Sequence, residues 1–128
     1  MILLLKTDNP VCEMALASDA KTIRSQWPAD RNLARDLLGQ LETFLGENDT
    51  AWHTLSGLVV FRGPGSFTGL RIAATVMNTL ADSLAIPIVG TLGNKWESDG
   101  LGLLKRNKNH RLVLPEYGSL PNVTRPKK

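Results

Sequence analysis

The chain has 128 residues and a formal net charge of +3, and 42% of its residues are hydrophobic, which is enough to bury the core of one ordinary domain. It has no run approaching the ~20 apolar residues of a membrane helix, and its start lacks the basic region and cleavage site of a signal peptide. These features predict a soluble, cytoplasmic protein. The single cysteine, Cys12, excludes an intramolecular disulfide and a thiolate metal cluster and is expected to be a small buried residue.

The charge is unevenly placed along the chain. Residues 1–92 hold seven Lys or Arg against nine Asp or Glu, whereas residues 93–128 hold eight against three. The basic character therefore belongs to the C-terminal part.

Three strands and a helix are predicted in the N-terminal half. Residues 2–6 and 12–17 are apolar runs, and residues 22–27 alternate in the manner of a third strand, which Pro28 ends. A helix is expected from about Asp30, a candidate cap, to Leu45, before a stop at Gly46. Its apolar residues at helical spacing are Leu33, Ala34, Leu37, Leu38, Leu41, Phe44 and Leu45.

The second half continues with a strand over residues 58–61, a glycine-rich loop, a helix over about residues 68–84 and a short strand over residues 87–89. A three-stranded meander followed by alternating helix and strand predicts an α/β fold with a mixed sheet.

The helix predicted over residues 68–84 is apolar around most of its circumference. Arg71, Thr75, Asn78 and Asp82 form its one narrow polar stripe. Such a helix is typically buried, and in a chain of this length part of its apolar surface is expected to remain for a partner. Complete burial within the chain is the alternative.

The loop between the strand and that helix is rich in glycine. Gly fits sharp turns and close backbone approach, and Ser66 or Thr68 could cap the helix. Unpaired N–H groups and the helix dipole make such a junction a potential anion site. The loop consists of Gly63, Pro64, Gly65, Ser66, Phe67, Thr68, Gly69, Leu70 and Arg71.

This nine-residue run resembles the signature of the TsaB (YeaZ) family. Residues 2–16, 31–45 and 86–90 are also similar to the family's first hairpin, leucine-rich helix and next strand, and Leu114 to Tyr117 resembles its Pro-x-Tyr terminus. Nine matching positions in the expected strand-to-helix context are a specific signal.

The resemblance implies a single ASKHA lobe, actin-like and RNase-H-like, with a mixed five-stranded sheet flanked by helices. It also implies a non-catalytic scaffold in the formation of threonylcarbamoyladenosine in tRNA. Such a scaffold pairs through helices of both subunits with a TsaD-like transferase, which a TsaE-like ATPase assists. The expected contact positions on the two helices are Leu33, Leu37, Leu41, Leu70, Ala73, Met77 and Ala81.

Two departures from related proteins bear on catalysis. Lys6 stands where the family has an aspartate at the end of the first strand, and an ammonium cannot replace a carboxylate in holding a metal. We expect it to be an exposed strand-end lysine. The TsaD-like transferase, a paralogue, has a His-x-x-x-His pair that binds a metal, and this chain has no counterpart of that pair. Its only histidines, His53 and His110, are far apart in sequence and are expected at the surface. We therefore expect no metal and no resident cofactor, with a nucleotide at most at an interface with partners.

Two other functions stay open at this stage. A small ASKHA enzyme could use residues 63–69 to bind the phosphates of a nucleotide. A homodimeric binding module unrelated to tRNA is the other alternative.

The predicted organisation is a lobe over residues 1–92, a basic loop over 93–110 in place of a second lobe, and a C-terminal strand and tail over 111–128. Tyr117 is expected to return the tail across the domain and cap a sheet edge or a helix pair. Candidate contacts to tRNA phosphates are Lys105, Arg106, Lys108 and Arg111.

Overall fold

The computed structural model describes residues 1–116 of the chain. Its elements are β1 (Ile2–Lys6), β2 (Val11–Ala17), β3 (Thr22–Pro28), α1 (Leu33–Glu47), β4 (Gly57–Gly63), α2 (Phe67–Leu84), β5 (Ile88–Leu92) and α3 (Trp96–Lys105). Two single-turn 3-10 helices, η1 (Asp30–Asn32) and η2 (Trp52–Thr54), precede α1 and β4.

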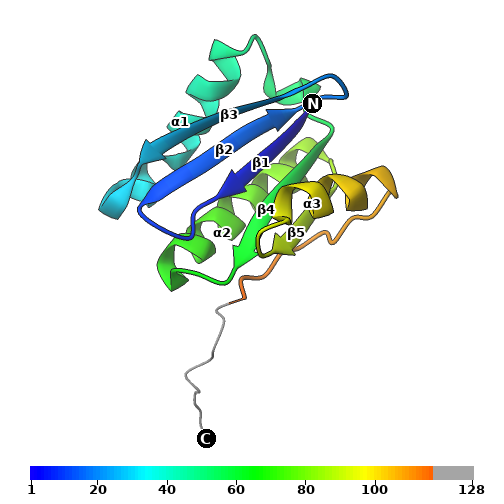
Figure 1. Cartoon of the computed structure of the whole chain (residues 1–128). Coiled ribbons are helices and arrows are strands. Elements are labelled where there is room, and N and C mark those ends of the chain that lie inside the picture. The colour runs from blue at the N-terminus through cyan, green and yellow to red at the C-terminus, as the bar shows by residue number, and fades with distance from the viewer. Residues whose placement is uncertain (117–128) are drawn as a thin grey trace, which may run out of the picture.

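The strands form one mixed sheet in the order β3-β2-β1-β4-β5 (Figure 1). β2 runs antiparallel to both β1 and β3, whereas β1, β4 and β5 are parallel to one another. The predicted mixed five-stranded sheet is confirmed. Parallel strands need crossover connections, and α2 supplies the one between β4 and β5.

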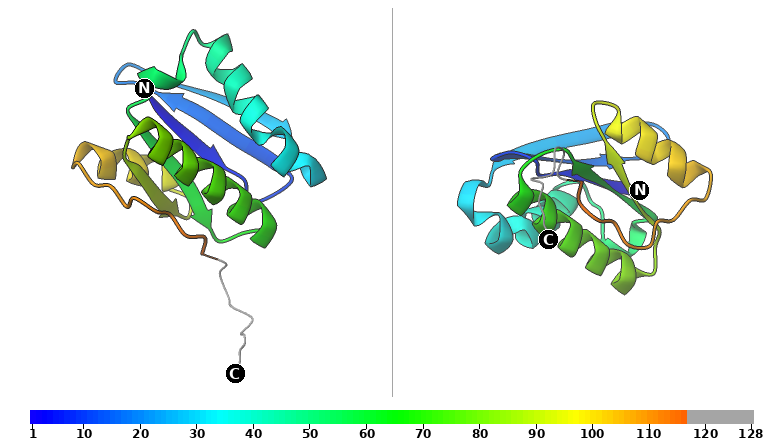
Figure 2. Two further views of the ribbon diagram at one scale, coloured as in Figure 1. Left: turned by 180° about the vertical axis from the view of Figure 1, so that it is seen from behind. Right: turned by 90° about the horizontal axis from the view of Figure 1, so that it is seen from below.

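Helices cover both faces of the sheet, so the molecule has three layers. α1 and α2 lie on one face and α3 lies on the other (Figure 2). Side chains therefore alternate along β1 between two hydrophobic clusters. Leu3 and Leu5 belong to the cluster with α1 and α2, and Leu4 belongs to the cluster with Trp96 of α3. Burial on both faces explains why β1 is a continuous apolar run.

The ends of the two predicted helices differ slightly from the sequence-based expectation. α1 starts after η1 with Asn32 at the N-cap position, so the expected cap at Asp30 is wrong, and the helix continues past Gly46 to Glu47. Ser66 occupies the N-cap position of α2, but its side chain makes no capping hydrogen bond. Ala85, in a left-handed conformation, ends α2 by donating its N–H to the carbonyl oxygen of Ala81.

The segment expected to be a basic loop contains a third helix, α3. Trp96 is 5% exposed and packs against the sheet with Leu101, Leu103 and Leu104. Gly100 lies against Val59 so closely that a Cβ atom would overlap the valine side chain. The glycine that suggested a loop is thus required for the close approach of helix and strand.

Residues 109–116, here called the strap, run along the outer side of β5 instead of forming the predicted strand. The N–H of Ile88 donates to Oδ1 of Asn109 (3.1 Å), and that of Gly90 donates to Nδ1 of His110 (3.0 Å). Asn78 of α2 binds both the N–H and the carbonyl oxygen of Val113. The side chains of Asn109 and His110, with one backbone bond from the N–H of His110 to the carbonyl oxygen of Ile88, therefore cap an edge that a strand would otherwise pair. The docking predicted for Tyr117 and the tail lies outside the described residues.

None of the helices within residues 1–116 combines the length and the apolar character needed to cross a lipid bilayer.

Candidate functional site

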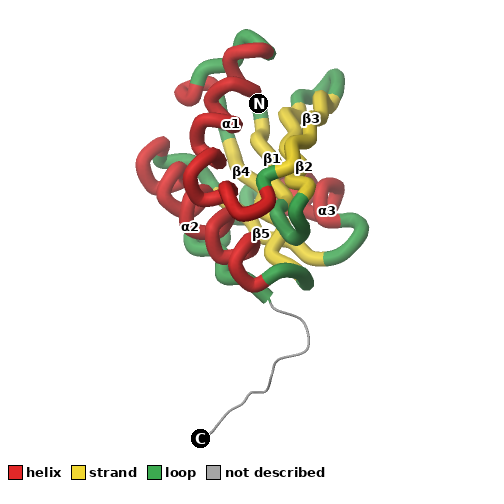
Figure 3. Tube along the Cα trace, turned by 90° about the vertical axis from the view of Figure 1, so that its left-hand side faces the viewer, coloured by secondary structure: helices red, strands yellow, loops and turns green. Residues whose placement is uncertain are grey.

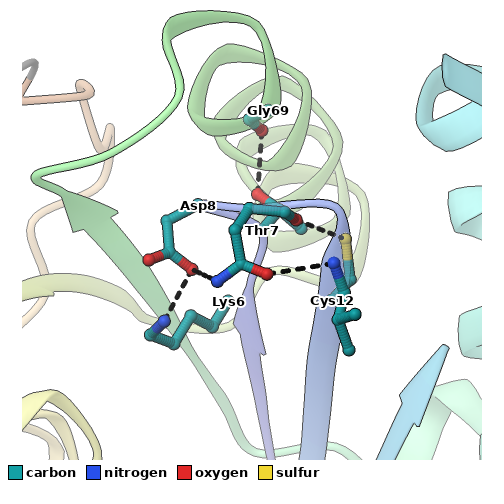
Figure 4. Close-up of polar contacts among 7 residues, drawn as sticks. Lys6, Thr7, Asp8, Cys12 and Gly69 are labelled. Atoms are coloured by element: carbon teal, nitrogen blue, oxygen red, sulfur yellow. Dashed lines mark hydrogen bonds and ion pairs between the residues drawn. The ribbon is translucent and has the colours of Figure 1, made fainter. Parts of the chain in front are cut away.

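The loop that carries the sequence motif lies where β4 turns into α2, against the turn that follows β1. The hydroxyl of Thr7 donates a hydrogen bond to the carbonyl oxygen of Gly69 (2.8 Å), and the N–H of Ser66 donates to the carbonyl oxygen of Asp8 (3.1 Å). Thr7 is 1% exposed. Figure 4 shows this junction, with the first turn of α2 directly beside the end of β1.

Two glycines of the loop are required by this contact. A Cβ on Gly65 would overlap Asp8, and a Cβ on Gly69 would overlap the carbonyl oxygen of Thr7. These glycines let two backbones approach closely. On this side the loop faces the β1–β2 turn, and a hollow of about 240 Å³ remains beside it, lined among others by Asn9, Ser66 and Thr68.

Lys6, at the position of the family's aspartate, is enclosed by its neighbours rather than exposed. Its Nζ lies 2.6 Å from Oδ1 of Asp8 (Figure 4) and 4.7 Å from the centre of the Phe61 ring. The Lys6 side chain is only 18% exposed, so the expectation of an exposed strand-end lysine is wrong. Phe61 in turn meets Trp96 edge to face, with ring centres 5.9 Å apart. The ammonium is thus fixed between a carboxylate and an aromatic face.

The environment of Cys12 makes its thiol unreactive. The residue is 1% exposed, as expected for a small buried residue. Burial, reinforced by the charges of Asp8 and Glu13, raises the pKa of the Cys12 thiol to about 11. At neutral pH the group is protonated and lacks the thiolate that nucleophilic attack or metal binding needs.

The two histidines occupy separate places, and both are exposed as predicted. His53 lies in η2, whereas His110 caps the edge of β5 from the strap. Residues 1–116 contain no group of three or more His, Cys, Asp or Glu side chains placed to hold a metal ion.

The seven helix positions expected to contact a partner are buried inside the chain itself. Their exposures range from 0% to 5%, and they pack against the sheet and each other. The apolar face of each helix is used for the protein's own core, so these positions are not available to a partner. The residues concerned are Leu33, Leu37, Leu41, Leu70, Ala73, Met77 and Ala81.

The outward face of α2, together with Ala34 of α1, forms a hollow of about 400 Å³, here called the helix groove. Phe67 at the start of α2 is 53% exposed, and Leu38 on α1 is also 53% exposed. The guanidinium carbon of Arg71 lies 5.4 Å from the centre of the Phe67 ring. The groove is lined by Ala34, Phe67, Thr68, Arg71, Ile72, Thr75 and Val76. The sequence predicts that part of the apolar surface of this helix stays exposed, but it does not place that surface at Phe67, which stands within the motif.

The four basic residues considered for tRNA binding are all exposed. Lys105 is the last residue of α3, Arg106 and Lys108 follow it, and Arg111 belongs to the strap. They are therefore accessible from solvent at the end of a helix and not within a long loop.

Comparison with known proteins identifies related sequences and folds. Residues 27–91 match the family model described as TsaD, tRNA N6-adenosine threonylcarbamoyltransferase. The tRNA threonylcarbamoyladenosine biosynthesis protein TsaB of Bacillus subtilis (strain 168) is 36% identical over 88 residues, covering 68% of this chain and 38% of the relative. The protein of the same name from Escherichia coli (strain K12) is 30% identical over 90 residues, covering 70% and 38%.

The structural comparison agrees with these matches. YeaZ from Pseudomonas aeruginosa superposes with a TM-score of 0.67 at 31% identity, over 71% of this chain and 43% of that one. The chain thus spans about two fifths of the length of the curated relatives. The shared sequence and the ASKHA-type sheet show that the chain belongs to the TsaB (YeaZ) family, within the group of proteins that the TsaD model describes.

Proposed function

We propose that this chain acts in the formation of threonylcarbamoyladenosine in tRNA as a non-catalytic subunit, which binds a TsaD-like transferase through the helix groove. The pathway is suggested by relatives named as threonylcarbamoyladenosine biosynthesis proteins. A TsaE-like ATPase belongs to the larger complex in this proposal, and the compartment is the cytoplasm.

The exposed apolar surface of the helix groove is the observation that carries the proposal. Phe67, which lines the groove, and Leu38, on the neighbouring helix α1, each leave about half of their surfaces in water, although the inner faces of both helices are buried. An aromatic ring beside an arginine is the kind of anchor that dominates protein interfaces. A pair of helices from a partner would bury this surface in a helical bundle.

The arrangement around Lys6 supports a role without catalysis. An ammonium paired with Asp8 repels a cation and offers no acceptor to it. In this proposal the TsaD-like transferase carries out the catalytic step. Within the complex, the exposed Lys105, Arg106, Lys108 and Arg111 are the residues we assign to contacts with tRNA phosphates.

Coexpression with the cognate TsaD-like protein, followed by size-exclusion chromatography, tests the proposal. The two proteins should elute together at micromolar concentrations. Leu38→Asp and Phe67→Asp should separate them, because each places a carboxylate in an apolar contact without touching the core.

Leu112→Asp is the matched control, since Leu112 is 61% exposed but lies on the strap and does not line the groove. It should leave the complex intact. Separate elution of the two unmodified proteins, or coelution of both the Phe67→Asp and the Leu38→Asp variants, would refute pairing through the groove and the adjoining face of α1. Normal threonylcarbamoyladenosine in tRNA after depletion of this protein, measured by mass spectrometry of nucleosides, would refute the role in the pathway.

A further inference from the structure

The two edges of the sheet differ in how they are covered. Figure 3 views the molecule from the β3 side, with α1 and α3 on opposite faces of the sheet. At the other edge the strap, orange in Figure 1, follows the outer side of β5. Side chains of the strap make part of this contact, and one of them is the imidazole of a histidine. The strap therefore contains a group on which a proton can act directly.

The contact between Gly90 and His110 requires one protonation state of the imidazole. The N–H of Gly90 donates to Nδ1 of His110 over 3.0 Å, so Nδ1 must offer a lone pair and the proton of the ring must be on Nε2. A protonated imidazole has an N–H at both nitrogens and accepts no hydrogen bond. His110 is exposed to solvent, whereas Gly90 is buried, so that its N–H would lose its partner in a place where an unpaired donor is costly. Protonation of the ring and its docked position therefore exclude each other.

The residues that follow His110 oppose and favour docking at the same time. The N–H of His110 donates to the carbonyl oxygen of Ile88 (2.8 Å), which holds the strap to the start of β5. Arg111 has a φ of 67°, a left-handed conformation that a residue with a side chain adopts only at a cost. Val113 is 2% exposed and fills the space above Gly90, where a Cβ would overlap its side chain. Opening the strap relieves the first and exposes the second, so the loss of one further contact can shift the equilibrium.

The charged groups around His110 do not compensate for this loss. β5 has no ionisable side chain, and Asp82 is the only one in α2 after Arg71. Histidine is the side chain that ordinarily changes its charge between pH 5 and 8, whereas lysine, arginine and carboxyl groups keep theirs. Within residues 1–116 no carboxylate forms an ion pair with His110 that would hold the protonated ring in place. The charged residues of the neighbouring elements and of the strap are Arg62, Asp82, Glu97, Asp99, Lys105, Arg106, Lys108, Arg111 and Glu116.

We propose that the strap is a pH-sensitive latch, in which protonation of His110 releases residues 109–113 from β5 and opens this edge of the sheet. The docked strap needs the neutral ring, whereas the released strap accepts either form. Docking is therefore favoured above the ordinary titration range of histidine, near pH 6.5, and is lost as the pH falls below it. The opened edge presents the N–H groups of Ile88 and Gly90, which an added strand can pair.

Amide hydrogen exchange of the full chain, followed by NMR and expressed as protection relative to an unstructured chain at the same pH, tests the proposal. Between pH 7.5 and pH 5 the amides of Ile88, Gly90 and Val113 should together lose about tenfold or more of their protection, while the amides of β4 keep theirs. The ¹⁵N shifts of the His110 ring should show the proton on Nε2 at pH 7.5. Unchanged protection at pH 5, or a loss confined to Gly90, would overturn the proposal, because the strap would then stay docked.

Substitutions at His110 separate the proton from the acceptor. His110→Asn places an amide oxygen at about the distance of Nδ1 from the backbone, and this oxygen accepts a hydrogen bond at any pH. It should keep the protection of Gly90 and abolish its pH dependence. His110→Ala has no acceptor and should give low protection at both pH values. His53→Asn is the matched control, since His53 lies in η2, and it should keep the pH profile of the wild type. A pH-dependent loss that persists in His110→Asn would contradict the latch.

Discussion

Thr7 and Gly69 are 62 positions apart in the sequence, yet the hydroxyl of Thr7 donates to the carbonyl oxygen of Gly69 over 2.8 Å in the buried junction between β1 and α2. The contact ties the first strand to the start of α2, the helix that supplies most of the lining of the helix groove. The position of Phe67 at the mouth of that groove thus depends on how closely the loop packs against the β1–β2 turn.

Gly69→Ala should lower the free energy of unfolding by about 2 kcal/mol, because the new methyl group would overlap the carbonyl oxygen of Thr7. Urea unfolding followed by circular dichroism measures the change. Gly39→Ala is the control: nothing lies near a Cβ on Gly39 in α1, so its stability should be unchanged or raised by up to about 1 kcal/mol. Equal effects of the two substitutions would contradict the close packing assigned to the loop.

Lys6→Met should reduce stability by less than about 1 kcal/mol, because a partly exposed ion pair contributes little and methionine keeps the contact with the Phe61 ring. Lys6→Asp should lower the stability further, since it removes the cation over the Phe61 ring and places a second carboxylate beside Asp8. The difference between the variants should shrink in high salt, which screens the repulsion. Thermal unfolding at two salt concentrations checks this, and a Lys6→Asp protein as stable as wild type would contradict the enclosure of Lys6.

Cys12 should make stability fall with pH in the alkaline range. The pKa of its thiol is raised from 9.0 to about 11 by folding, so the unfolded chain loses this proton first. Below about pH 9 the thiol keeps its proton in both states and makes no contribution to the pH dependence. Between about pH 9 and 11 the free energy of unfolding should decrease by about 1.4 kcal/mol per pH unit through this group.

Comparison with Cys12→Ala isolates that contribution, because other groups also titrate in this range. The difference in unfolding free energy between the wild-type and the Cys12→Ala protein should not change with pH up to about pH 9. Above that pH the difference should become smaller, because only the wild-type protein loses stability through this group. A constant difference up to pH 11 would show that the Cys12 pKa is not raised in the folded protein.

Asn78→Ala should release the middle of the strap. The Asn78 side chain makes hydrogen bonds of 2.9 and 3.0 Å to the backbone of Val113, and its removal leaves both buried groups unpaired. The Val113 amide should lose at least about tenfold of its protection against hydrogen exchange. Thr79→Ala is the control, since the Thr79 hydroxyl bonds only within α2. Unchanged protection of Val113 in Asn78→Ala would mean that other contacts hold the strap.

Periodicity alone was sufficient to find most of the elements. β1, β2, β3, α1, α2 and β5 all appear close to their expected positions, because each combines a clear period with a turn residue at its end. α3 and the strap were missed because their patterns are short and interrupted. Gly100 is typical of a loop in the sequence, whereas in the structure it allows α3 to approach Val59 closely. Val113 is held by the side chain of Asn78 and not by the backbone hydrogen bonds of a β-ladder.

The sequence by itself determined the family and the order of elements from β1 to β5, since the loop at residues 63–71 and the alternation of apolar runs are local properties of the chain. Only the tertiary structure decided which side of each helix is core. Leu37 and Leu38 are adjacent and chemically identical, yet one is fully buried and the other is 53% exposed. The difference arises from the sheet on which α1 packs, and the surroundings of Lys6 likewise come from Phe61 and Asp8 together. Such choices depend on contacts between distant segments, which no local pattern records.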